Sequence, residues 1–147
     1  MDTLNAFLTE RGYTRTKLHQ TKTNHFEVIA TLNGVKGLFI LDTGASNSCV
    51  GFESIELFNL DAEESEVKAA GAGAIDMETK LSEKNKIKIG KWQNDKLALI
   101  LFNLTHVNTA LVNHKSKPVD GIIGADILKK GKAIIDYNKK YLYLKIN

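Results

Sequence analysis

Hydrophobic residues recur along this chain with two different periods, which predict a helix at the start and strands after it. Leu4, Phe7 and Leu8 recur at the spacing of one helical face, and Gly12 stands where a helix would end. This segment is expected to form a short amphipathic helix, and a polar, basic connector is expected to follow it through Thr21.

A clear hairpin signal comes next. Apolar and polar residues alternate over residues 26–32, Asn33-Gly34 follows, and residues 35–41 are again rich in apolar residues. Asn-Gly between two such runs is a strong signal for a tight β-turn. The pattern therefore predicts a β-hairpin whose second strand runs directly into Asp42.

The middle of the chain is expected to be entirely β. Residues 51–68 are acidic and are expected to be solvated. Three further strands are expected, with polar turns between them. The strands cover residues 75–81, 86–90 and 97–102, and the turns cover residues 82–85 and 90–95.

The last thirty residues are predicted to form a strand, a short helix and a hairpin. A buried strand is expected through Ile122 and Ile123, then a short helix from Ala125 to Gly131, then a hairpin that turns at residues 138–139. We expect an N-terminal helix and connector over residues 1–21, and one mainly β domain over residues 22–147. One or two short helices are expected in all.

Composition and charge exclude several classes of function. Lys and Arg total 20 against 17 Asp and Glu, a balance too even for nucleic-acid binding by bulk charge. No apolar run is long enough to span a membrane. With a single cysteine, Cys49, and no recognisable signal peptide, the expected location is the cytoplasm. The four histidines lack metal-ligand spacing, so no metal is predicted.

Candidate chemistry is concentrated in the segment Leu41-Asp42-Thr43-Gly44-Ala45. A carboxylate directly after an apolar strand is held by the scaffold and still reachable. Gly44 is expected to allow a backbone conformation or close approach that a Cβ would block, and Thr43 adds a hydroxyl. Taken alone, Asp-Thr-Gly is equally consistent with an ordinary turn.

A second segment, Ile122-Ile123-Gly124-Ala125-Asp126, changes this balance. An Asp-Thr-Gly-Ala loop after a strand, a glycine-bearing segment, and later an apolar-apolar-Gly strand leading into a helix occur here in the order found in retropepsin-like aspartic proteases. Over about residues 24–146 the chain resembles this family, most closely its bacterial members. The resemblance implies a closed, mostly antiparallel acid-protease barrel.

The same resemblance implies roles for individual residues. Asp42 corresponds to the catalytic aspartate, Thr43 to the residue whose hydroxyl braces paired loops, and Gly44 to the loop glycine. Residues expected to contact substrate are Ala45 and, in the flap, Ala70, Gly71, Ala72, Gly73 and Ala74. The chemistry needs two carboxylates, whereas one chain carries one such loop. The implied protein is therefore a homodimer that cleaves peptide or protein substrates without a cofactor.

An alternative keeps the fold without the chemistry. In it, the chain is a monomeric peptide-binding or interaction module, and Asp42 only satisfies loop amides. The rival acid Asp120, before Gly121, lacks the intervening hydroxyl residue and is interpreted as part of a turn. Asp126 is explained by the dipole of the helix that it opens, and Cys49 as a small buried residue.

Overall fold

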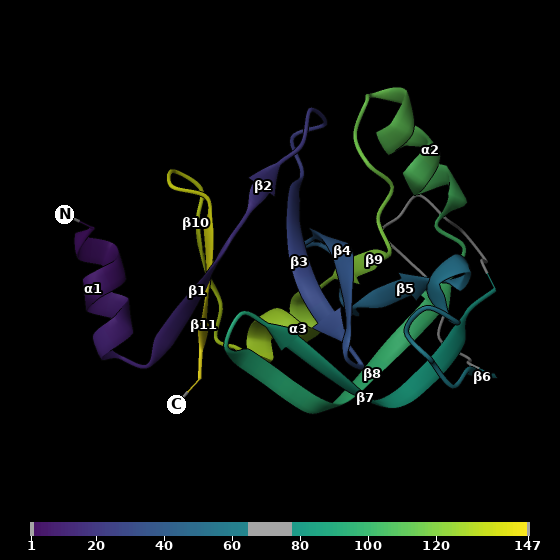
Figure 1. The fold of residues 1–147 in the computed structure, drawn as a ribbon, viewed down its shortest axis with the longest axis horizontal. Helices are drawn as coiled ribbons and strands as arrows, with labels where there is room; N and C mark the ends of the chain where they lie inside the picture. The colour runs from purple at the N-terminus through teal and green to yellow at the C-terminus, as the bar shows by residue number, and fades with distance from the viewer. Residues whose placement is uncertain (1, 65–77, 147) are drawn as a thin grey trace.

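The architecture is a closed six-stranded barrel with a small three-stranded sheet at one end, seen in a computed structural model that describes residues 2–64 and 78–146 (Figure 1). The barrel strands are β3 (Phe26–Leu32), β4 (Val35–Leu41), β9 (Gly121–Ile123), β5 (Cys49–Gly51), β8 (Trp92–Phe102) and β7 (Lys80–Ile89), named in their order around the barrel. Two short strands, β2 (His19–Gln20) and β6 (Glu63–Glu64), extend the sheet beside β3 and β7.

Pairing of β7 with β3 closes the barrel, through Thr31 opposite Lys88 and Leu32 opposite Ile87. Four of the six ladders are antiparallel, and the other two, β4 with β9 and β5 with β8, are parallel. The prediction of a mainly β, closed acid-protease barrel is confirmed. A closed sheet leaves no barrel edge open to pair with other chains.

Apolar residues of β4 alternate between two clusters. Phe39 and Leu41 join the main core inside the barrel, whereas Ile40 joins a smaller cluster that includes Ile122 and Leu111. Leu111 belongs to α2 (Thr105–Asn113), so this helix covers the smaller cluster. Alternate residues of a strand face opposite sides of the sheet, and both sides of β4 are therefore packed.

The predicted hairpin is confirmed, with β3 and β4 joined by Asn33 at φ 50° and Gly34 at φ 86°. Positive φ at both positions is what the tight hairpin turn requires. The Asn33 side chain also donates to the Phe58 carbonyl, at 3.0 Å. The turn is thus tied to the segment that follows β5.

The expected connector before residue 22 contains two strands. Within it, β1 (Tyr13–Lys17) pairs with the C-terminal strand β11 (Tyr141–Lys145), and β2 pairs with β3. The small sheet consists of β1, β11 and β10 (Ile134–Asp136), in the order β1-β11-β10. Strand β1 has no period-2 apolar pattern, because its residues YTRTK are polar or aromatic.

The expected turn at residues 82–85 is wrong, because β7 continues through it as one strand with a bulge between Ser82 and Asn85. The Asn85 side chain is buried and donates to the carbonyls of Ser82 and Leu97. Polar residues that suggested a turn here satisfy the bulged backbone instead. Similarly, β8 begins at Trp92, so the second expected turn is much shorter than residues 90–95.

Helix α2 was missed, and the expectation that this part of the chain is all β is wrong. An Asn103 side chain accepts from the backbone N–H of Thr105 at 2.8 Å, and so satisfies a free donor at the start of the helix. The acidic segment after β5 is also less solvated than expected. Phe58 and Leu60 are buried in the main core, and Phe52–Ser54 form a 3₁₀ turn.

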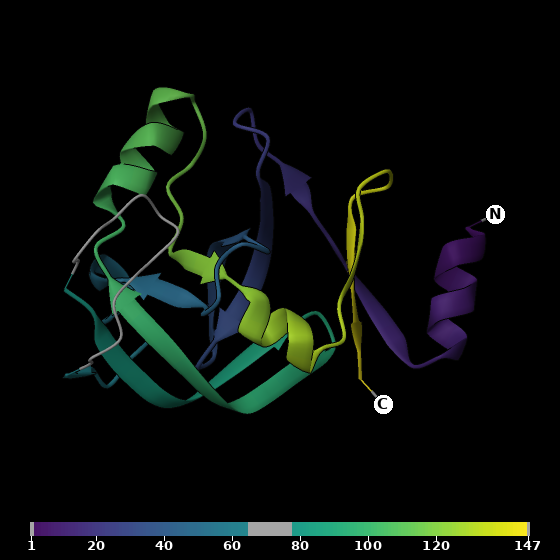
Figure 2. The ribbon, with the colours of Figure 1, turned by 180° about the vertical axis from the view of Figure 1, so that it is seen from behind.

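The predicted terminal elements are confirmed. Helix α1 spans Thr3–Glu10, helix α3 spans Ala125–Lys130 and is followed by Gly131, and β10 and β11 form the final hairpin. Figure 2 shows α1 and this hairpin together at one end of the molecule, with α2 at the other. Within the described residues, no helix is long and apolar enough to cross a membrane.

Candidate active site

Asp42 lies at the point where β4 ends, and the strand beside it fixes the start of its loop. Strand β9 runs between β4 and β5, with Leu41 opposite Ile123. The backbone N–H of Asp42 donates to the Ile123 carbonyl at 2.9 Å, which extends this ladder by one bond. Two strands distant in sequence therefore hold the first residue of the loop.

Within the loop, the Asp42 carboxylate is half-buried and accepts one hydrogen bond. Its Oδ1 accepts from the backbone N–H of Gly44 at 2.9 Å, in an exposed bond. The Asp42 carbonyl accepts from the backbone N–H of Ala45 at 3.2 Å, while Thr43 and Gly44 are exposed. The carboxylate is thus oriented by the backbone and left open to the surface.

Of the two reasons expected for Gly44, a special backbone conformation is absent, and the close approach there is to Asp42 itself. Gly44 does not have a positive φ, and an added Cβ would lie 3.3 Å from Asp42 Oδ1 with no other atom within 4 Å. What the structure uses at Gly44 is its N–H, which any residue except proline supplies. The close approach that requires glycine lies elsewhere, at Gly124.

Gly124 joins β9 to α3 directly against the Asp42 loop. A Cβ at Gly124 would lie 2.6 Å from the Ala45 carbonyl oxygen, so a larger residue would force the loop away. The same carbonyl accepts from the Ala125 N–H at 2.7 Å. The second sequence segment is therefore in contact with the first.

Ser48 and Asp126 form a bracket beneath this loop that the sequence reasoning missed. Asp126 Oδ1 accepts from the Ser48 hydroxyl at 2.6 Å and from the Ser48 N–H at 2.9 Å. The Ser48 oxygen accepts in turn from the Gly124 N–H at 2.8 Å. Asp126 thus ties the two segments together, besides standing near the start of α3. No local pattern indicated this pairing, because the partners are 78 residues apart.

A pocket of about 230 Å³ lies beside the Asp42 carboxylate. Three segments line it: the end of β4 with its loop, the turn before β3, and the β10–β11 hairpin. Tyr137 in this hairpin is 71% exposed, and its ring centroid lies 4.9 Å from that of Phe26. Asp42 is the one carboxylate among the described lining residues of this pocket.

Asp120 has the structural role that the sequence suggested. It lies in a bend just before β9, where its Oδ2 accepts from the Leu38 N–H at 3.0 Å and its Oδ1 from the Ser54 hydroxyl at 2.9 Å. Both bonds are partly buried. The Asp120 carboxylate therefore links β4 and the 3₁₀ turn to the start of β9.

Cys49 is buried, in agreement with its interpretation as a small core residue, and is 5% exposed. Burial raises the pKa of its thiol to about 12, partly offset by a backbone hydrogen bond at Ile122. A neutral, buried thiol is a poor nucleophile. The expected flap residues Ala70, Gly71, Ala72, Gly73 and Ala74 lie outside the described residues.

Comparison with known proteins decides the family. The model of a family described as aspartyl protease matches residues 28–127, which include the Asp42 loop, Ser48 and Asp126. The chain belongs to the aspartyl protease family. A search among curated proteins finds no match.

Solved structures of retropepsin-like proteins share the fold of this aspartyl protease family member. One is a retropepsin-like aspartic protease from Rickettsia conorii, 20% identical, with a TM-score of 0.56 over 90% of this chain and 89% of that one. Another is the retroviral protease-like domain of Ddi1 from Leishmania major, 19% identical, with a TM-score of 0.55 over 90% of each chain.

A third is the EIAV protease complexed with the inhibitor HBY-793, 20% identical, with a TM-score of 0.53 over 75% of this chain and 90% of that one. At these identities the similarity establishes the retropepsin-like fold. The activity of this chain has to be argued from its own residues.

Proposed function

We propose that this protein is an aspartic endopeptidase that works as a homodimer, with Asp42 of each copy forming the catalytic pair. The observation that carries the proposal is the state of the Asp42 carboxylate. It lies on a loop fixed by β9, Gly124 and the Ser48–Asp126 bracket, yet it accepts a single exposed hydrogen bond from the described residues. A rigidly held acid with free acceptor capacity suits chemistry better than structure.

The reaction needs one carboxylate of the pair ionised and the other protonated. Two carboxylates held close together do not both ionise readily, so a shared proton is their natural state. The ionised Asp42 takes a proton from water as the water oxygen bonds to the peptide carbonyl carbon, and the protonated Asp42 gives its proton to the carbonyl oxygen. The carboxyl group that took the water proton then gives it to the amide nitrogen, the other carboxylate takes a proton from one hydroxyl of the tetrahedral intermediate, and the C–N bond breaks. No covalent enzyme intermediate forms.

The proposal also gives roles to the three residues after Asp42, which are Thr43, Gly44 and Ala45. The exposed Thr43 hydroxyl is available to brace the loop of the second copy, and the Gly44 N–H holds the Asp42 carboxylate in place. Ala45 is half-buried with its carbonyl bonded to Ala125, so it forms a fixed edge of the site next to substrate. The substrate is a peptide or protein segment.

The experiment is digestion of a mixed peptide library by the wild-type protein and by Asp42→Asn, with products identified by mass spectrometry. Asp42→Asn keeps the shape but removes the ionisable acid, so cleavage is expected to fall by about 10²–10⁴-fold. Asp61→Asn, at an exposed aspartate outside the site, is the matched control and should cleave normally. Cleavage should also fall at alkaline pH, where the pair loses its shared proton.

Two outcomes would overturn the proposal. Undiminished cleavage by Asp42→Asn would assign the chemistry to another group. A wild-type protein that binds peptides but cleaves none of them would favour the silent interaction module.

A further inference from the structure

A second pocket, of about 820 Å³, lies on the face of the β3–β4 hairpin that points away from the main core. The sheet contributes Glu27 and Ile29 of β3 and Leu38 of β4, which lies opposite Ile29 in the ladder. Residues 16–22, before β3, and residues 115–117, after α2, line the rest. Its described lining residues and those of the Asp42 pocket do not overlap, so the two sites are separate.

Glu27 is the unusual residue of this pocket. It is 6% exposed, and its Oε2 is buried with no hydrogen-bond partner within residues 2–64 and 78–146. Its backbone is fixed between two strands, with His19 of β2 on one side and Ile40 of β4 on the other. A buried carboxylate without a partner costs free energy, and proteins usually satisfy such groups. This free acceptor therefore marks a place where a donor from another molecule can bind.

The pocket also carries four lysines, and none of them forms an ion pair with Glu27 in the described part of the chain. They are Lys17, Lys22, Lys115 and Lys117, and all are exposed. The first of them donates instead to the Lys139 carbonyl, at 3.0 Å. The pocket thus combines one buried acid with several exposed cations around it.

This charge pattern selects a class of ligand. A guanidinium or ammonium group is the strongest donor for a buried carboxylate, because the bond is charge-assisted. Exposed lysines would repel a ligand that carries only positive charge, and they favour one that also carries acids. The apolar side chains of Leu18, Ile29 and Leu38 suit the methylene stem of a basic side chain. A peptide segment with a basic residue between acidic neighbours has all of these parts.

We propose that this pocket is a second peptide-binding site, in which Glu27 receives the cationic group of a basic side chain and the surrounding lysines contact acidic residues beside it. The segment belongs to a partner protein or to a part of a substrate remote from the cleaved bond. The inference goes beyond the proposed function and does not depend on it, because the pocket shares no described lining residue with the Asp42 pocket.

The first test uses two capped, fluorescein-labelled peptides, Glu-Leu-Arg-Leu-Glu and the same peptide with citrulline in place of arginine. Citrulline keeps the size of the side chain but has no charge. Binding is measured by fluorescence anisotropy in the Asp42→Asn background, so that the peptides stay intact. The arginine peptide should bind about 10- to 100-fold more tightly, because hydrogen bonds between charged groups are lost with citrulline.

Glu27→Gln, added to the same background, should remove this preference, because glutamine has the same shape without the charge. Glu83→Gln, at an exposed acid of β7 outside the pocket, is the matched control and should keep the preference. An unchanged preference in Glu27→Gln would overturn the inference. Equal binding of the two peptides by the protein with Glu27 intact would overturn it as well.

The second test fills the pocket from within the chain, and it remains decisive if Glu27→Gln does not fold. Ile29 is 59% exposed and lies two residues from Glu27 on the same face of β3, so Ile29→Arg places a guanidinium beside Glu27. This variant should bind the arginine peptide at least about 10-fold more weakly. Leu57→Arg, at a side chain that is 51% exposed and outside the pocket, should bind normally. Normal binding by Ile29→Arg would contradict the proposed site.

The third test distinguishes a peptide from a small organic cation. A peptide with glutamine in place of both glutamates should bind about 3- to 10-fold more weakly at low salt, where the exposed lysines are least screened. Butylguanidinium alone should displace the arginine peptide only at much higher concentration. Butylguanidinium that binds as tightly as the peptide would overturn the assignment of a peptide ligand.

Failure of this inference and failure of the proposed function give different results. If Asp42→Asn abolishes cleavage while Glu27→Gln keeps the preference for arginine, the endopeptidase stands and the second site is wrong. If Glu27→Gln removes the preference while cleavage survives Asp42→Asn, the second site stands and the catalytic assignment is wrong.

Discussion

Asp42 and Asp120 are two half-buried acids near the ends of β4 and β9, and their surroundings differ sharply. Asp120 accepts partly buried hydrogen bonds from Leu38 and Ser54, which lie in two other parts of the barrel. Asp42 accepts one exposed bond, from Gly44 two residues away. The Asp120 carboxylate therefore links parts of the fold, whereas the Asp42 carboxylate remains accessible at the surface.

The hydrogen-bond partners of an aspartate, more than its burial, therefore separate a structural acid from a candidate catalyst. Removing an engaged carboxylate leaves donors unsatisfied, which costs stability. Removing a poorly engaged one costs little stability and should cost function instead.

The largest effect is expected from Asp120→Ala compared with Asp42→Ala. Loss of the Asp120 carboxylate leaves the Leu38 N–H and the Ser54 hydroxyl without their acceptor, and should lower the free energy of unfolding by about 3 kcal/mol. Asp42→Ala should lower it by less than about 1 kcal/mol. Urea unfolding followed by circular dichroism measures both. Equal losses in the two variants would remove the distinction between the two acids.

Ser48→Ala tests the contribution of a third acid, Asp126, to stability. Ser48 is 1% exposed, and its hydroxyl bonds both Asp126 and the Gly124 N–H, so its loss should cost about 2 kcal/mol. Because the bracket holds the Asp42 loop, peptide cleavage should also fall under conditions where the variant is fully folded. Ser46→Ala, at an exposed serine in the same loop, is the control and should change neither property.

Cys49 extends the comparison to a buried titratable group. Burial raises the pKa of this thiol from 9.0 to about 12, so the folded protein keeps it protonated at pH values where the unfolded chain loses the proton. Stability should be unaffected below pH 9.0 and should fall as the pH rises from there toward 12. Alkaline denaturation of the wild-type protein and of Cys49→Ala measures this effect, which the variant should lack.

A labelling experiment provides a second check on Cys49. At mildly alkaline pH, a thiol reagent should react with the native protein only as fast as it unfolds. Rapid labelling without unfolding would show that the thiol is accessible and ionised.

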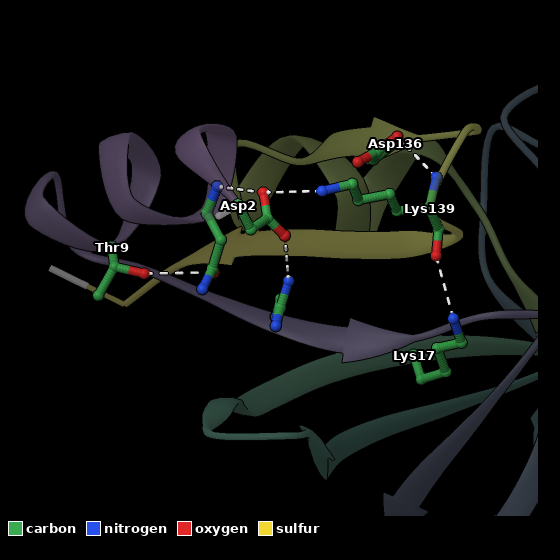
Figure 3. A network of polar contacts seen from close by, with 7 residues as sticks. Asp2, Thr9, Lys17, Asp136 and Lys139 are labelled. Atoms are coloured by element: carbon green, nitrogen blue, oxygen red, sulfur yellow. Dashed lines mark hydrogen bonds and ion pairs between the residues drawn. The ribbon is translucent and has the colours of Figure 1, made fainter.

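The smallest effect is expected at Asp2, a half-buried acid on the surface that is engaged by several donors. It caps α1 through the Asn5 N–H and forms ion pairs with Arg15 at 2.8 Å and Lys139 at 3.5 Å (Figure 3). The bond from Asn5, together with Arg15 and Lys139, lowers the pKa of Asp2 below 3.8. The stabilisation is therefore present above pH 3.8 and is lost as the pH falls through the lower, folded-state pKa.

This effect should appear as a small acid-induced fall in melting temperature that Asp2→Asn abolishes. Lys17 bonds the Lys139 carbonyl in the same region, and that bond does not involve a titrating acid (Figure 3). Lys17→Met should therefore leave the acid dependence unchanged. An Asp2→Asn variant with the acid dependence of the wild-type protein would show that another group titrates.

Elements with strong local signals were predictable. The β3–β4 hairpin followed from Asn33-Gly34, and α3 followed from an apolar run that ends at Gly131. Helix α2 and strand β1 are not indicated by the sequence, because α2 has Leu104 at its N-cap, with no capping side-chain bond, and β1 lacks an apolar face of its own. The bulge at Asn85 was taken for a turn, since polar residues satisfy a bulged backbone as well as a turn.

The candidate site likewise has some residues that the sequence indicates and others that it does not. Asp42, Thr43 and Gly44 could be found because they are consecutive and follow a strand. The Ser48–Asp126 bracket could not, because its partners are 78 residues apart and each looks ordinary in its local sequence. The place of β10 beside Asp42 depends on which strands pair, and pairing over long separations is set by packing of the whole barrel.

Local sequence patterns are enough to establish that the chain forms strands of a mainly β domain and carries a single Asp-Thr-Gly segment after one of them. These properties are local, since periodicity and turn residues act over a few positions. The folded barrel sets which acid is engaged, what holds the Asp42 loop, and which strand lies beside that loop. Those properties depend on contacts between distant residues, which exist only once β9 has passed between β4 and β5 and the barrel has closed.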